Sequence, residues 1–201
     1  MGKGAQTRQQ ILDVALDAAS RCGLEGITIG QLAESCGMSK SGLFAHFRSR
    51  EDLQLAILDT ATAQFVAAVL HPALSEKRGI QRLRAIVTNW FKLQRGEARR
   101  ACIFLSGSTE YDDRPGPLRD AIADLHRQWR RDLSTSVQHA IDLRQLEAST
   151  DPEQVAFEIF ALVMALHHDR RLLDDTKAHE RAIQAFERML RTYGAKTERS
   201  S

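Results

Sequence analysis

The chain has 201 residues and a mass of 22.5 kDa, enough for one full hydrophobic core and a small second module. Its 43% hydrophobic and 27% charged residues are typical of a globular protein. The chain has four prolines, and this small number disfavours a turn-rich β architecture. No uninterrupted apolar run approaches the ~20 residues that span a bilayer, so no membrane partner is expected. The first ten residues lack a secretion signal and the three cysteines form no disulfide or zinc pattern, which together predict a cytoplasmic protein.

The small charge excess lies at the N-terminus. Residues 1–50 hold six basic and four acidic side chains, whereas the remaining 151 residues balance to zero. An excess of two charges is only a weak indication of a nucleic-acid partner, because electrostatic binders usually carry a dense basic patch.

Capping patterns predict the first two helices. Capping boxes beginning at Thr7 and Thr28 predict helix starts, and Gly23 and Gly37 predict the corresponding ends. Ser39 then caps a third short helix, predicted over residues 40–47. Two short helices joined by a glycine-containing turn form a helix-turn-helix motif.

The third helix has the dimensions of a DNA-reading element. Residues 39–47 would span ~13 Å, which fits a major groove about 12 Å wide. With Leu43 and Phe47 packed inward, the outward set is small, polar and cationic. That set comprises Ser39, Lys40, Ser41, Gly42, Phe44 and His46.

The run from Ile11 to Leu53 resembles, without gaps, the DNA-binding domain of TetR-family transcriptional regulators. Its strongest elements are Thr28, the Leu32-Ala33-Glu34 run before Gly37, then Ser39-Lys40, Leu43, His46-Phe47 and Ser49-Arg50-Glu51. The resemblance implies that Lys40, Phe44 and His46 reach DNA from the recognition helix. It also implies that Thr28 and Arg50 hold phosphates. Phe44 stands where the family commonly has tyrosine, and Gly30 where it often has a longer side chain.

The remaining chain reads as helical, with no alternating strand pattern. The predicted fold is all-α: a three-helix helix-turn-helix DNA-binding domain over residues 1–53, then a larger helical ligand-binding and dimerisation domain over 54–201. Helix four, from about residue 50, links them. The later helices are predicted over 50–70, around 83–90, weakly over 101–111, then over 118–143, 153–173 and 176–193.

The helix predicted over 153–173 is apolar on more than one face, so its second face needs a partner. TetR-type proteins dimerise through their last two long helices, which implies a homodimer here. The candidate interface residues are Phe157, Phe160, Met164, Ile183, Phe186 and Leu190. Twofold symmetry then predicts a pseudo-palindromic operator on double-stranded DNA, with half-sites about 34 Å apart.

Aromatic residues suggest a small-molecule effector. The resemblance implies a cavity with apolar walls and few polar anchors, which suits such a ligand. The candidate residues are Trp90, Phe104, Trp129, Tyr111, His126 and His167. The alternative is that these side chains only fill the core.

Signatures of catalysis, cofactors and metals are absent from the sequence. There is no phosphate-binding loop, nucleophile elbow or zinc-protease motif. His167 and His168 are adjacent on a helix and diverge by about 100°, so they do not share an ion. We therefore expect no enzyme. The resemblance implies a dimeric repressor instead, one that a small apolar ligand releases from its operator. One alternative is a DNA-binding regulator without an effector, controlled by a protein partner or cysteine oxidation; another is a helical enzyme.

Overall fold

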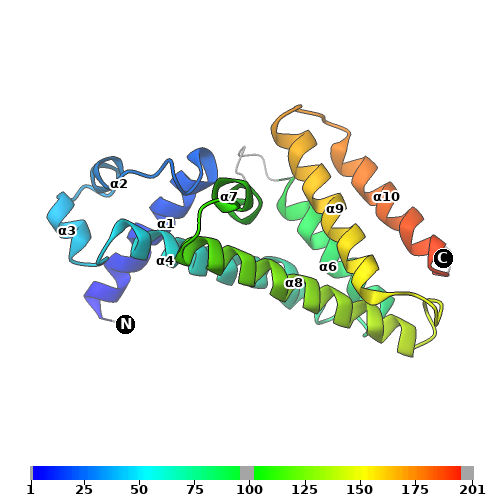
Figure 1. Ribbon diagram of the computed structural model, residues 1–201. Coiled ribbons are helices and arrows are strands. Elements are labelled where there is room, and N and C mark those ends of the chain that lie inside the picture. The colour runs from blue at the N-terminus through cyan, green and yellow to red at the C-terminus, as the bar shows by residue number, and fades with distance from the viewer. Residues whose placement is uncertain (1, 96–101, 196–201) are drawn as a thin grey trace. The chain divides into compact units, whose positions relative to one another are not determined.

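The computed structural model describes residues 2–95 and 102–195, and within these ranges all regular secondary structure is helical (Figure 1). This confirms the all-α fold class. The elements are α1 (Lys3–Cys22), α2 (Ile29–Ser35), α3 (Lys40–Phe44), α4 (Arg50–Phe65), the π-helical turn η1 (Val66–Leu70), α5 (His71–Ala73), α6 (Ile80–Leu93), α7 (Ile103–Tyr111), α8 (Pro117–Asp142), α9 (Pro152–Arg171) and α10 (Ala178–Thr192). Residue 101, where the sequence predicts the start of a helix, lies outside the described residues.

The chain forms two compact units. The first, here called the head unit, comprises Met1–Gln64 and Ala98–Asp124; the second unit comprises Phe65–Glu97 and Leu125–Ser201. Helix α7 and the start of α8 therefore belong with the DNA-binding motif by packing, although they lie far from it in sequence. The functional boundary near residue 53 stays a prediction.

Buried apolar side chains from three helices form the core of the helix-turn-helix in the head unit. Ile11, Leu32 and Leu43 come from α1, α2 and α3, and each is at most 3% exposed. Phe47 closes this core at 1% exposure. Their burial fixes α3 against α2, and burying each such side chain stabilises the fold by roughly 1.5–3 kcal/mol.

Helix α1 begins earlier than the sequence predicts. It starts at Lys3, with Gly2 as N-cap in an extended conformation, and Thr7 lies inside the helix. The Gly2 carbonyl accepts hydrogen bonds from the amides of Ala5 and Gln6, so the first turn forms without a side-chain cap. The predicted end is confirmed, because Gly23 follows with a positive φ of 77°.

The helix from Arg50 continues through Pro72, which the sequence predicts as its end. The π-helical turn at Val66–Leu70 accounts for the difference: the amide of His71 bonds to the carbonyl of Val66, five residues back. Proline is tolerated in the first turn of the short α5 that follows, because its missing N–H is not needed there.

The segment Arg50–Ala73 is long and apolar enough to cross a membrane by length and composition, and 44% of its most apolar window is buried inside the protein. Charged residues at positions 50–52 and 59 interrupt this segment, so the expectation, which concerns uninterrupted apolar runs, is unchanged. Leu53, Ile57, Leu58 and Phe65 are each at most 3% exposed, so the apolar character of this segment reflects its place in the protein core.

The second unit is built on α6, α9 and α10, which pack on one another (Figure 1). Asp151 caps α9 by accepting a hydrogen bond from the amide of Glu153, and Pro152 occupies the first turn, as the sequence predicts. Arg84 on α6 pairs with Glu187 on α10 through two N–O contacts of 3.0 Å. This forked ion pair fixes the register of the two helices.

Candidate DNA-binding site

The helix-turn-helix is built by two side-chain caps. Thr28 Oγ1 accepts from the amide of Gln31 at 3.3 Å and donates to the Gln31 side chain at 2.8 Å. Ser39 Oγ accepts from the amide of Gly42 at 3.1 Å. Both predicted caps are confirmed, and together they set where α2 and α3 begin.

Helix α3 is shorter than predicted. It ends at Phe44 rather than Phe47. The next turn tightens, because the amide of His46 bonds to the carbonyl of Leu43, only three residues back. Phe47 still reaches the core from this tightened turn, so the shortening does not change which side chains face outward.

The predicted DNA-facing residues all lie in the head unit, and most are exposed. Phe44 is 47% exposed, so its ring lies at the surface of the head unit. The other exposed members of the set are Thr28, Ser39, Lys40, Ser41 and Arg50, while Gly42 and His46 are half-buried. The short helix thus presents a small polar surface with one apolar ring.

Gly30 makes room for Lys40, which sequence reasoning missed. A β-carbon at Gly30 would lie 3.3 Å from Cε and 3.7 Å from Nζ of Lys40. The sequence suggests that glycine here loses a contact to DNA. The structure shows that the lysine of the next helix passes over this position, and this pairing across the turn leaves no signal in the sequence.

A second cation, Arg8 on α1, lies over the ring of Phe47, with 4.9 Å between the guanidinium carbon and the ring centroid. A cation held over an aromatic face gains roughly 0.5–1 kcal/mol at an exposed site. Arg8 thereby links α1 to Phe47, the buried residue just after α3.

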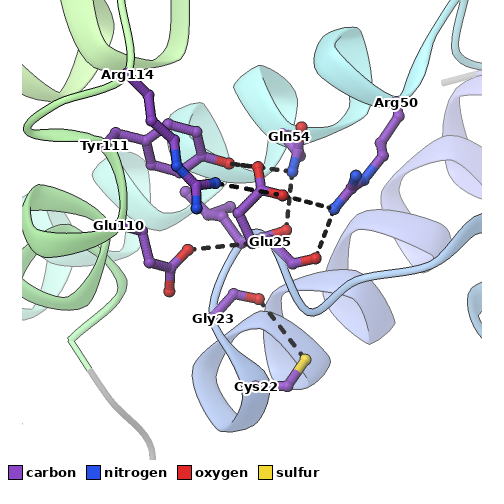
Figure 2. A network of polar contacts seen from close by, with 9 residues as sticks. Cys22, Gly23, Glu25, Arg50, Gln54, Glu110, Tyr111 and Arg114 are labelled. Carbon is purple, nitrogen blue, oxygen red and sulfur yellow. Dashed lines mark hydrogen bonds and ion pairs between the residues drawn. The ribbon is translucent and has the colours of Figure 1, made fainter.

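Arg50 is held by the loop after α1. Its Nη2 donates to the backbone carbonyl of Glu25 at 2.5 Å and lies 3.3 Å from the carboxylate oxygen Oε2 of the same residue (Figure 2). Arg114 Nη1 lies 3.7 Å from that oxygen. Glu25 therefore gathers two cations at the edge of the head unit.

Glu25 is bound in turn by Tyr111 from α7. The phenol donates to Glu25 Oε1 at 2.6 Å, and Gln54 Nε2 lies 3.3 Å from the phenol oxygen while donating to the carbonyl of Leu24 at 2.8 Å. Glu110 accepts from the amide of Glu25 at 3.1 Å. Figure 2 shows these groups converging on the loop from α4 and α7. We call Glu25, Arg50, Gln54, Glu110, Tyr111 and Arg114 the Glu25 network.

The charges of the network are settled by these contacts. The hydrogen bond from Tyr111 lowers the pKa of Glu25; burial opposes this, and the guanidinium groups of Arg50 and Arg114 lower it further. Burial, followed by the hydrogen bond and the charge of Glu25, raises the pKa of Tyr111. At neutral pH the carboxylate is ionised and the phenol keeps its proton.

The aromatic candidates divide between the two units. Trp90, Trp129 and His126 lie together in the second unit with Phe65 and Phe160, at centroid distances of 4.5–5.9 Å. Phe104 and Tyr111 lie on α7 in the head unit, and the Tyr111 hydroxyl is engaged with Glu25. His167 lies on α9, where burial, together with Arg171 and His168, lowers its pKa.

The predicted dimer residues also differ in exposure. Phe160, Phe186 and Leu190 are at most 5% exposed within the single chain, so they fill its own core. Phe157 is 53% exposed, whereas Met164 and Ile183 are half-buried. Only these last three retain surface that a partner could cover. Among the residues with described positions, no group of three His, Cys, Asp or Glu side chains could hold a metal ion.

A short helix that is capped by Ser39, begins at Lys40 and follows a tight turn after α2 is typical of a helix-turn-helix DNA-binding protein. Two family models agree. "Bacterial regulatory proteins, tetR family" matches residues 11–57, and "Tetracyclin repressor-like, C-terminal domain" matches residues 79–186. The chain belongs to the TetR family and is a DNA-binding transcriptional regulator of the repressor type. Membership also confirms that it is no enzyme.

Individual proteins show how far the similarity extends. The regulator TtgR of Pseudomonas putida is 25% identical over 179 residues, covering 85% of this chain and 83% of TtgR. A TetR-family regulator from Cytophaga hutchinsonii superimposes with a TM-score of 0.85 at 18% identity, covering 98% and 99% of the two chains. AibR, solved with isovaleryl coenzyme A and operator DNA, gives a TM-score of 0.70 at 25% identity, covering 90% and 98%. Some curated relatives match over a short stretch alone, 22–24% of their own length.

Proposed function

We propose that the chain acts in the cytoplasm as a homodimeric repressor that binds a pseudo-palindromic operator and leaves it when a small apolar ligand binds. The observation that carries this proposal is the surface of α3: small polar side chains, Lys40 passing over Gly30, and Phe44 exposed to 47%. Small residues permit close approach to the DNA backbone and base edges. Their helix is anchored by buried Leu43 and Phe47, so its position is fixed before DNA arrives.

Roles within the head follow from the chemistry of the exposed groups. Lys40 and Arg50 would contact phosphates, and Ser39, Ser41, Gly42 and His46 would lie in the major groove. Thr28 would present the N-terminus of α2 to a phosphate. Phe44 lacks the hydroxyl of tyrosine, so its contribution would be apolar contact with a sugar or a thymine methyl.

Dimerisation would use the outer face of α9 together with α10. Phe157 and the exposed Ala161 and Ala165 lie four residues apart along α9, which places them on one stripe. Ile183 on α10 and Met164 on α9 would add apolar surface. A dimer presents two heads, and linking two weak contacts raises the affinity for a two-site operator through effective concentration.

The aromatic cluster of the second unit would line the ligand site. Trp90 is 1% exposed, and its indole Nε1 has no hydrogen-bond partner among the described residues. A buried donor without an acceptor costs about 1–3 kcal/mol. A ligand with a flat or branched apolar body and one hydrogen-bond acceptor would relieve that cost. AibR, a protein of similar fold, has been solved with both isovaleryl coenzyme A and operator DNA, which supports a small acyl compound as the class of ligand and leaves the release of DNA to be tested.

Control by cysteine oxidation receives less support. Burial raises the pKa of the Cys36 and Cys102 thiols, which reduces the reactive thiolate. Cys22 is exposed, and its thiol donates to the backbone carbonyl of Ala18 at 3.3 Å. The ligand-responsive function is therefore the one that we propose.

The DNA-binding proposal is tested by selecting preferred sites from random duplex DNA and measuring affinity for them at several salt concentrations. Lys40→Ala should weaken binding and reduce the slope of log affinity against log salt by about 1, because one phosphate contact is lost. Lys77→Ala, an exposed lysine of the second unit, is the matched control. Equal slopes for Lys40→Ala and the wild type would remove Lys40 from the interface.

Ligand response is tested by titrating the protein on its selected operator with apolar metabolites and coenzyme A thioesters. Both tryptophans of the chain, Trp90 and Trp129, lie in the aromatic cluster, so ligand binding there should change the tryptophan fluorescence. We expect the same compounds to release DNA with matching concentration dependence. Compounds that change the fluorescence and leave DNA affinity intact would contradict the switch.

A further inference from the structure

The Glu25 network joins α7 to a residue of the proposed DNA surface through one carboxylate. Tyr111 donates to Oε1 of Glu25 at 2.6 Å, whereas Oε2 faces Arg50 at 3.3 Å and Arg114 at 3.7 Å. The two oxygens thus serve different partners (Figure 2). The pair Glu25 and Tyr111 lies 86 residues apart in sequence.

Arg50 is fixed by a single nitrogen. Its hydrogen bonds within the described structure all come from Nη2, to the carbonyl and carboxylate of Glu25. The Nε and Nη1 donors make no hydrogen bond to the described residues, and the side chain is 43% exposed. A guanidinium anchored at one corner keeps its remaining donors for an incoming phosphate, which binds such groups in a two-pronged fashion.

A carboxylate is the natural competitor for those donors. If both oxygens of Glu25 were available, Arg50 could form a forked ion pair with them and present less of its charge to DNA. The phenol of Tyr111 already donates to Oε1 at 2.6 Å, which makes that oxygen a weaker acceptor for a second donor from Arg50. We propose that Tyr111 and Glu25 are positioning residues for DNA binding: Tyr111 ties up one carboxylate oxygen, so Arg50 remains anchored by its Nη2 and available to a phosphate.

The position of α7 therefore controls Arg50. Gln54 and Glu110 hold the same loop through Leu24 and the Glu25 amide, and Gly107 of α7 lies close to Leu24, since a β-carbon there would be 3.6 Å from Leu24 Cδ1. A displacement of α7 by about 1 Å would take the Tyr111 bond beyond hydrogen-bond range. Glu25 would then turn to Arg50, and DNA affinity would fall without any movement of α3.

This inference rests on the proposed phosphate contact of Arg50, and a double-mutant cycle separates the two. Affinity for the selected operator is measured by fluorescence anisotropy for the wild type, Tyr111→Phe, Arg50→Ala and the double variant. We expect Tyr111→Phe to weaken binding roughly 2- to 10-fold, the range of a typical hydrogen bond. In the Arg50→Ala background the same change should have no effect. It should also have no effect with Glu25→Gln, because a neutral amide cannot form the forked ion pair.

Tyr193→Phe is the matched control. The Tyr193 hydroxyl donates to Glu158 Oε1 at 2.9 Å in the second unit, so this variant removes the same kind of bond away from Arg50. It should leave DNA affinity unchanged. Equal losses in the Tyr111→Phe and Tyr193→Phe variants, or an equal loss from Tyr111→Phe with and without Arg50, would show a general effect on folding and overturn the inference.

The remaining outcomes are also distinct. Wild-type affinity in Tyr111→Phe combined with weakened Arg50→Ala would overturn the positioning role and leave the phosphate contact in place. Wild-type affinity in Arg50→Ala would remove the phosphate contact and the inference with it. Thermal unfolding of each variant serves as the control for folding. We expect Tyr111→Phe to unfold close to the wild-type temperature, because phenylalanine keeps the packed ring.

Discussion

The two units of this regulator differ in the chemistry that stabilises each of them internally. In the head unit, α7 is joined to the loop after α1 by directional polar contacts centred on Glu25. In the second unit, helices meet through rings, with Phe65 stacked on Trp129 at 4.5 Å and Trp90 edge-on to both. Ring contacts depend on buried area and tolerate sliding, whereas hydrogen bonds are lost over about 1 Å. The polar contacts of the head unit are therefore more easily broken by small displacements than the ring contacts of the second unit.

The largest expected effect comes from emptying the aromatic cluster. Trp90→Ala should lower the free energy of unfolding of the second unit by about 3–5 kcal/mol, because it removes a fully buried indole and leaves a cavity. The fluorescence of Trp129 follows that unit during urea denaturation. Trp90→Phe, which keeps a ring, should lose less. An unchanged denaturation midpoint for Trp90→Ala would show that the cluster is not structural.

A smaller effect is expected in the head unit from Gly23→Ala. Gly23 has φ 77° and ψ 171°, a region that is almost restricted to glycine and costs other residues about 1–3 kcal/mol. A β-carbon there would also overlap the carboxylate of Glu110 and displace it from the Glu25 amide. Circular dichroism should show earlier unfolding of the head unit, while tryptophan fluorescence keeps the wild-type transition.

Gly37→Ala separates the two contributions. Gly37 has φ 63°, and no atom lies within 4 Å of an added β-carbon, so this variant bears the backbone cost alone. Gly23→Ala should therefore be the more destabilising of the two. Equal losses in the two variants would indicate that Glu110 moves aside without cost.

The smallest effect concerns pH. Because Tyr111 lowers the pKa of Glu25 in the folded state, the stability that Glu25 contributes is present above its ordinary pKa of 4.5 and is lost as the pH falls through the lowered folded value. The difference in stability between the wild type and Glu25→Gln should therefore shrink on acidification below pH 4.5. A difference that grows toward acid would mean that Glu25 is protonated in the fold.

Much of the helix-turn-helix could be predicted from sequence, because the hydrogen bonds that cap its helices join residues close together in the chain. Thr28 and Ser39 each bond to an amide three residues on, and the spacing alone reveals such caps. The Glu25 network could not be predicted, since nothing in the sequence pairs Glu25 with Tyr111. Pro72 misled the prediction for a related reason: the widened turn that accommodates it is visible only in the backbone.

The widened turn at Val66–Leu70 has a consequence for the phase of its helix. Phe65, Val69 and Ala73 are spaced by four and are all at most 3% exposed. In a regular α-helix each step of four rotates by about 40° past a full turn, so the third residue would drift away from the core. The extra residue of the wide turn removes part of this drift. Deleting one residue here would restore regular α-helical bonding and rotate Pro72 and Ala73 about the helix axis. The number of residues in this turn therefore determines which of the following side chains face the core.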